Sequence, residues 1–162
     1  MQLISLPAAI TLTEWSERTF WRKFADGSMA RKIVNGKTMI PLDLIKPHLC
    51  LPFEPEDFLV LKSADSGDAE AQNEMALIFL SSDKPKCAIY WLEQAAKQGY
   101  ADAMNLLSQC YMRGNGVPKD ENTGVIWLAK AAAHGHLISQ RQMDGLRTKL
   151  PPTEIIAFKR GS

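Results

Sequence analysis

The feature that most constrains the fold is an internal repeat in the last two-thirds of the chain. The segment YWLEQAAKQGYADAMNLL at residues 90–107 recurs as IWLAKAAAHGHLISQRQM at residues 126–143, at an offset of 36. An earlier copy, LVLKSADSGDAEAQNEMALIF at residues 59–79, matches at an offset of 32. Self-similarity at such a spacing is typical of stacked helical repeats, in which no unit buries its apolar face alone.

Each repeat predicts two antiparallel helices. Apolar residues recur every three or four positions in both halves of the unit, which is the spacing of one helix face. The alanines let helix backbones approach, and Trp91 and Trp127 at equivalent positions are expected to fill the space between layers. Gly99 and Gly135 stand where a helix ends in the left-handed conformation that favours glycine.

The loop inside the later repeat carries strong turn residues. In RGNGVPKDE, Gly114 and Gly116 allow a tight turn, and Pro118 prevents the preceding helix from continuing. Asp120 is then expected to cap the next helix. The corresponding loop of the earlier copy is four residues shorter, which accounts for the change of offset.

This pattern resembles the SEL-like repeat family, which is related to the tetratricopeptide repeats. The resemblance rests on Y-x-x-G-x-G-V-x-x-D at 111–120 and on the tryptophan, alanines and glycine that follow, and it covers about residues 56–150. The family's usual helix-starting alanine is Gly124 here, a small loss of helix propensity. The resemblance implies a short α-solenoid whose concave face holds a protein or peptide and which carries no catalytic chemistry.

The same resemblance implies where a partner would bind. The first helices of the repeats would line the concave face, through which a protein partner or a second copy of the chain would bind. A half-repeat at 56–66 and a capping helix in LPPTEIIAFKR at 150–160 are expected to flank the full repeats. The candidate partner-binding side chains are polar ones on the first helices, with simple solvation as the alternative: Asn73, Asn105, Gln109 and Gln142.

The first third of the chain has a different pattern. Ser5 predicts the N-cap of a short helix from Leu6 to about Thr11. Ser16 predicts the cap of a second helix, Glu17 to about Ala25, and Gly27 is expected to end it. Phe20 and Phe24 lie four residues apart and are expected to face the core.

A short basic hairpin follows in RKIVNGKTMIP, residues 31–41. Asn-Gly between β-prone arms predicts a type I′ turn at Asn35-Gly36. This turn sets the register, pairing Val34 with Lys37, Ile33 with Thr38 and Lys32 with Met39. An isolated hairpin is marginally stable in water, so it is expected to lean on the helices before it.

Helix, turn, helix and hairpin, with S-x-R-T at the start of the second helix, resemble the winged helix-turn-helix of excisionase/MerR-like DNA-binding modules. That resemblance implies a second helix in the major groove and a wing on the DNA backbone. Trp21 lies between the core-facing side and the DNA-facing side of this second helix. Its side chain is expected either to pack in the core or to contact the edge of a DNA phosphate. Carried over by position, the DNA-facing residues are Arg18, Thr19, Arg22, Lys23, Arg31, Lys32 and Lys37.

Charge supports DNA contact only weakly. The net charge is +1, although residues 1–49 hold seven Lys/Arg against four Asp/Glu. Three cysteines without a CxxC pair argue against a disulfide framework and against zinc, and they suit a reducing compartment. With no signal peptide or membrane span in the sequence, a cytoplasmic, bacterial protein is expected.

Motifs of enzymes are missing from the sequence. It contains no P-loop, GxGxxG or HExxH, so we expect no catalysis, no cofactor, no metal and no small-molecule substrate. The HGH at residues 134–136 is expected at a surface corner, and Cys110 in the core. Cys87 begins a helix, a position that lowers a thiol pKa, although no base is evident nearby.

The sequence thus predicts a mostly α protein, with a winged helix-turn-helix at 1–49, a stiff linker at 50–55 that contains Pro52 and Pro55, and a repeat solenoid at 56–162. The two parts are expected to keep a fixed relation. The favoured function is a DNA-associated regulator or adaptor. The alternative is a non-DNA-binding scaffold in a bacterial signalling or secretion assembly, with the front module docking a protein.

Overall fold

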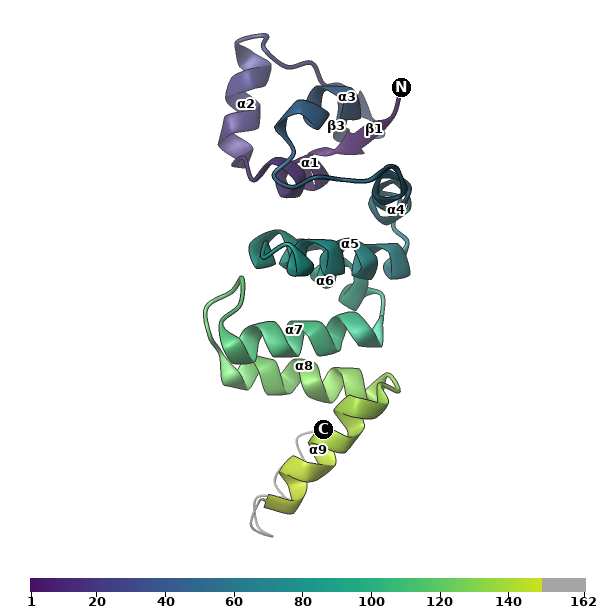
Figure 1. Cartoon of the computed structure of the whole chain (residues 1–162), viewed down its shortest axis with the longest axis vertical. Coiled ribbons are helices and arrows are strands. Elements are labelled where there is room, and N and C mark those ends of the chain that lie inside the picture. The colour runs from purple at the N-terminus through teal and green to yellow at the C-terminus, as the bar shows by residue number, and fades with distance from the viewer. Residues whose placement is uncertain (150–162) are drawn as a thin grey trace.

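The computed structural model describes residues 1–149 and is mostly helical (Figure 1). The capping helix expected at 150–160 lies outside the described residues. In chain order the elements are β1 (Leu3–Ser5), α1 (Leu6–Thr13), α2 (Glu17–Ala25), β2 (Lys32–Val34), β3 (Lys37–Pro41), α3 (Leu42–Ile45), a 3-10 turn (Lys46–His48), α4 (Pro55–Asp65), α5 (Ala69–Ser81), α6 (Pro85–Lys97), α7 (Ala101–Arg113), α8 (Glu121–Ala133) and α9 (Leu137–Lys149).

Helices α4 to α9 form a stack in which each helix packs on the next along the chain. The pairs α5/α6 and α7/α8 are the two-helix units that the repeat predicts, and α4 is the expected half-repeat. Figure 1 shows the front elements at one end of this stack and α9 at the other. The prediction of a short run of helix pairs is therefore confirmed for the described residues.

The expected helix ends are also confirmed. Gly99 and Gly135 have φ values of 83° and 89°, in the left-handed region. Asp120 caps α8 by accepting the Thr123 N–H at 3.1 Å. A Cβ on Gly116 would lie 2.6 Å from the Pro85 carbonyl carbon, so this loop lies directly against the start of α6.

Gly124 has a packing role that the sequence does not reveal. It is buried near the start of α8, and a Cβ there would lie 2.5 Å from Cγ of Met112 on α7. Glycine therefore permits the close approach of these two helices, and the lower helix propensity is the cost of that contact.

The front module contains the predicted helices and hairpin. Ser5 and Ser16 cap α1 and α2, and α2 has the predicted bounds. The hairpin register matches the prediction at all three pairs. Asn35 and Gly36 have φ values of 50° and 75°, and positive φ at both positions is what a type I′ turn requires.

Strand β1 was not predicted. It pairs with β3 to give a three-stranded antiparallel sheet in the order β1-β3-β2, with Ile4 opposite Ile40. Both isoleucines are fully buried. Three residues are too few to show the alternation by which a strand is read from sequence, and the strand exists only through pairing with β3.

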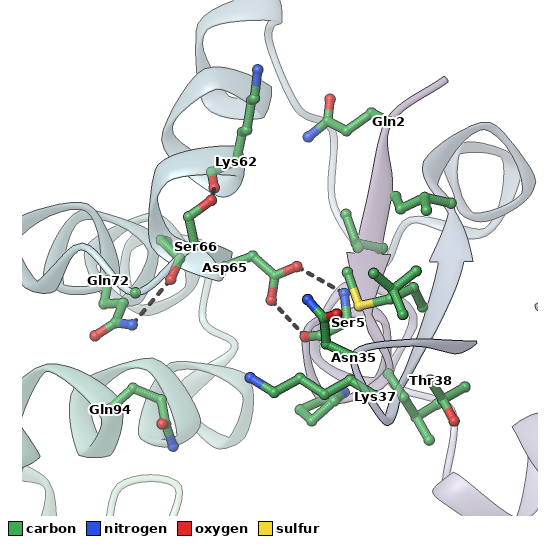
Figure 2. Close-up of a pocket in the computed structure, with 18 of the residues that line it drawn as sticks. Gln2, Ser5, Asn35, Lys37, Thr38, Lys62, Asp65, Ser66, Gln72 and Gln94 are labelled. Carbon is green, nitrogen blue, oxygen red and sulfur yellow. Dashed lines mark hydrogen bonds between the residues drawn. The ribbon is translucent and has the colours of Figure 1, made fainter. Parts of the chain in front are cut away.

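The front module and the repeats share one hydrophobic core. Trp91 on α6 is 1% exposed, and its Nε1–H donates to Oγ1 of Thr11 on α1 at 3.1 Å. At the end of α4, Asp65 accepts hydrogen bonds from the Ser5 N–H at 2.7 Å and the Ser5 hydroxyl at 2.5 Å (Figure 2). These contacts place α1 and β1 against the first layer of the repeats. The domain boundaries at 49 and 55 stay a prediction.

Replacing Thr11 with valine tests this junction. Thr11→Val keeps the side-chain shape but leaves the buried Trp91 N–H without an acceptor. The free energy of unfolding should fall by about 1–3 kcal/mol, the cost of a buried unpaired donor. Chemical denaturation measures it, with Thr38→Val on β3 as the control. The loss should shrink in a Trp91→Phe background, and an equal loss there would contradict the proposed contact.

Candidate functional site

Helix α2 presents a basic outer surface. Phe20 is its only buried side chain, and it anchors the helix to the core. Arg18 and Arg22 are exposed on the same helix. Figure 1 shows α2 at the outer side of the front module, at the end of the molecule far from α9. The helix is therefore accessible to a large partner.

Aromatic rings hold the base of the hairpin against α2. The Arg31 guanidinium lies 4.6 Å from the Trp21 ring centroid and 5.1 Å from that of Phe24. The Trp21 Nε1–H donates to Glu17 at 3.0 Å, and Trp21 remains 41% exposed. Each such cation–π contact is worth about 0.5–1 kcal/mol at exposed sites. Trp21 therefore links the hairpin to α2 and lies outside the buried core.

The seven residues expected to face DNA separate into groups. Thr19 shares a hydrogen bond with the Ser16 hydroxyl, and the Lys23 ammonium lies 4.6 Å from the Trp15 ring centroid. Figure 2 shows the Lys37 side chain extending toward the side of the groove where Gln94 of α6 lies. Arg31 stacks on aromatic rings as described. Within residues 1–149, the exposed members that make no hydrogen bond, ion pair or ring contact are Arg18, Arg22, Lys32 and Lys37, and the first three of these are left as candidates for DNA contact.

Two of the four polar residues expected to meet a protein partner lie in the interior. Asn73 is 7% exposed, and its Oδ1 is buried with no hydrogen-bond partner among residues 1–149. Asn105, also 7% exposed, donates to the Ser139 hydroxyl at 2.8 Å and accepts from Gln109 at 2.8 Å. Asn105 thus ties α7 to α9. Gln109 and Gln142 lie at the surface.

Gln109 and Gln142 border one depression on the last helices, of about 360 Å³. Leu146 at its rim is 39% exposed. Apolar walls with a few amide groups suit the insertion of a side chain from another protein. The lining residues are Ser108, Gln109, Met112, Leu128, Gln142, Gly145, Leu146 and Lys149.

The expectation of a lowered pKa at Cys87 is wrong. Burial, with smaller contributions from the neighbouring Cys50 and Glu14, raises the pKa of this thiol to about 12. Lys84, which would lower it, is paired with Glu14 at 2.9 Å. Desolvation therefore outweighs the helix N-terminus. Cys110 is buried as expected, and burial raises its pKa as well.

Alkylation kinetics test the chemistry of Cys87. A pKa near 12 leaves only ~10⁻⁴ of the thiol ionised at pH 8, and the thiolate is the reactive form. Iodoacetamide should therefore modify Cys87 in the folded chain at least ~100-fold more slowly than in the guanidinium-unfolded chain, with the rate rising as pH rises. Peptide mass spectrometry follows each cysteine separately. Equal rates in the two states would contradict a raised pKa at Cys87.

The histidines make local hydrogen bonds. His134 Nδ1 lies 2.8 Å from the Lys130 carbonyl oxygen, and His136 Nδ1 lies 2.7 Å from the Ser139 hydroxyl. In the described part of the chain, no group of three or more acidic, histidine or cysteine side chains is placed to hold a metal ion. No helix within residues 1–149 is long and apolar enough to cross a membrane.

Comparison with known proteins identifies the repeats. The Sel1 repeat family matches residues 69–100 and 101–136. No curated protein matches the chain. Neither this family match nor the solved structures below supports a winged helix in the front module.

Two solved structures are similar to this chain. A Sel1 repeat protein from Oxalobacter formigenes has a TM-score of 0.56 and 28% identity over 62% of this chain. A protective antigen of uropathogenic Escherichia coli with an SLR fold has a TM-score of 0.52 and 33% identity over 56% of this chain. The matches span 31% and 20% of those longer proteins. Residues 69–136 of this chain therefore consist of two Sel1 repeats, in agreement with the resemblance read from the sequence.

Proposed function

We propose that this protein is a non-catalytic adaptor that holds a protein partner on its repeat helices. The observation that carries the proposal is the pair of Sel1 repeats at 69–136, because such repeats generally mediate contacts between proteins. Extended stacks of helix pairs offer wide surfaces suited to a polypeptide. The apolar depression bordered by Gln109 and Gln142 is the proposed contact point on the later helices.

A charge placed in the depression tests the adaptor function. Gln142 is exposed, and Gln142→Glu puts a carboxylate against an apolar wall. Partners captured from a bacterial lysate by the full-length chain should bind this variant roughly tenfold or more weakly, a loss of about 1.4 kcal/mol. The matched control is Asn122→Asp, which adds a charge at the exposed start of α8. Equal capture by all three proteins would contradict the proposed contact point.

A second candidate function is DNA contact by the front module. It is favoured by the exposure of Arg18, Arg22 and Lys32, which have no ion pair within residues 1–149. The nearby acidic side chains make no ion pair with these residues: Glu17 accepts from Trp21, and Asp26 accepts from the Ser28 N–H while also interacting with Lys23 and Arg22 at longer range. Guanidinium groups on an accessible helix suit phosphates and guanine edges. In the alternative, the same surface docks a protein in a signalling or secretion assembly.

Salt dependence separates DNA contact from its alternative. Binding to mixed genomic fragments, measured by fluorescence anisotropy, should weaken as salt rises, with a log–log slope of about −0.9 for each phosphate contacted. Arg18→Glu combined with Arg22→Glu should remove this binding, whereas Lys97→Glu at the exposed end of α6 should keep it. Wild-type protein that does not bind these fragments at low salt would overturn the DNA proposal and leave the adaptor proposal intact.

A further inference from the structure

A groove of about 1190 Å³ separates the front sheet from the first helices of the stack (Figure 2). Strand β1 and the hairpin form one wall. The end of α4 and one side of α6 form the other. The volume lies above the ~300–1,000 Å³ typical of small-molecule pockets, and the groove is partly open to solvent. Its volume is therefore sufficient for a short segment of polypeptide.

Some polar groups in the groove are already satisfied by the fold. Asp65 accepts the two hydrogen bonds from Ser5. The Gln72 side chain donates to the Ala64 carbonyl at 3.0 Å and accepts from Gln98 at 2.9 Å. These groups hold the walls together, and Asp65, the one carboxylate among the lining residues, has a hydrogen bond from Ser5 at each oxygen.

Other polar groups have bonding capacity left for a ligand. Within residues 1–149, the ammonium groups of Lys37 and Lys62 have no ion pair. The Gln2 Nε2 is buried and has no hydrogen-bond partner in the same range. Figure 2 shows Lys62 and Gln2 toward one end of the groove and Lys37 and Gln94 toward the other. Two unpaired cations on opposite walls favour a ligand with separated negative charges.

The backbone of β1 adds a second kind of contact. The Ser5 N–H points away from β3, because Asp65 accepts it. The Leu42 N–H donates to the Gln2 carbonyl, so Leu3 and Pro41 form a pair that exchanges no hydrogen bonds. The N–H and C=O of Leu3 consequently point outward from the sheet edge. An open strand edge can pair with another extended chain.

We propose that this groove binds an extended acidic segment of a partner protein. Its backbone pairs with the outer edge of β1 at Leu3, and its carboxylates bind Lys37 and Lys62. The inference rests on the proposed adaptor function and specifies a site on it that is distinct from the depression between α7, α8 and α9.

Peptide selection on the full-length chain tests the proposal. A random decapeptide library should yield binders with at least two Asp or Glu residues several positions apart. Measured by fluorescence anisotropy, such a peptide should bind Lys37→Gln and Lys62→Gln roughly tenfold more weakly each. Lys97→Gln is the matched control and should bind as the wild type does. N-methylation of the peptide residue that pairs with Leu3 should weaken binding without a change of charge.

The outcomes separate this site from the adaptor function itself. Recovery of no binders, of binders without acidic residues, or of binders indifferent to both lysine substitutions would overturn the groove proposal. Binders that lose affinity with Gln142→Glu alone would overturn the groove and support the depression instead. Circular dichroism confirms that each exposed-lysine variant keeps its fold.

Discussion

The packing of α1 on α6 around Trp91 is the contact on which the rest of the structure depends. Helix α1 contributes Ala8 and Ala9, which are fully buried and small enough for the two helices to approach closely. Leu12 adds a larger buried surface. Full burial of a large apolar side chain stabilises a fold by about 1.5–3 kcal/mol, and a buried tryptophan also needs an acceptor for its N–H. Thr11 supplies that acceptor, and the front module and the repeats can therefore share one core.

Trp91 and Trp127 occupy equivalent positions in the two repeats, and comparing them shows how the front module changes the surroundings of a repeat helix. Trp91 is buried under α1, whereas Trp127, thirty-six residues later, is only half-buried, and the Lys130 ammonium lies 4.5 Å from its ring centroid. The same residue thus has different surroundings in the two repeats. The front module covers the first layer of helices, where a further repeat would otherwise pack. It also forms one wall of the groove, so the proposed site exists only because the two parts are joined.

Local sequence features predicted local structure well. The Asn35-Gly36 turn fixed the hairpin register, and the serine caps placed the starts of α1 and α2, because each depends on neighbouring residues alone. The repeat predicted the helix pairs because the pattern recurs over many residues.

Features that depend on distant residues were not predictable. Strand β1 forms only against β3, and the buried amide of Asn105 finds its acceptor in Ser139 on α9. The pKa of Cys87 depends on burial beside Cys50, thirty-seven residues earlier, and the helix N-terminus visible in the sequence is the weaker effect. The groove lies between parts of the chain about sixty residues apart, so no short motif reveals it.

Because the front module and the repeats share one core, further repeats can be inserted at one end of the stack more easily than at the other. Because α1 and β1 occupy the face on which a preceding helix pair would stack, an added repeat before α4 would separate Thr11 from Trp91 and Ser5 from Asp65. A repeat added between α8 and α9 would separate Asn105 from Ser139, but its first helix would pack on α8 in the place that α9 now holds, so the contacts of the front module would stay intact. Length variation in proteins built on this plan is therefore expected to be confined to the later repeats, with the groove left unchanged.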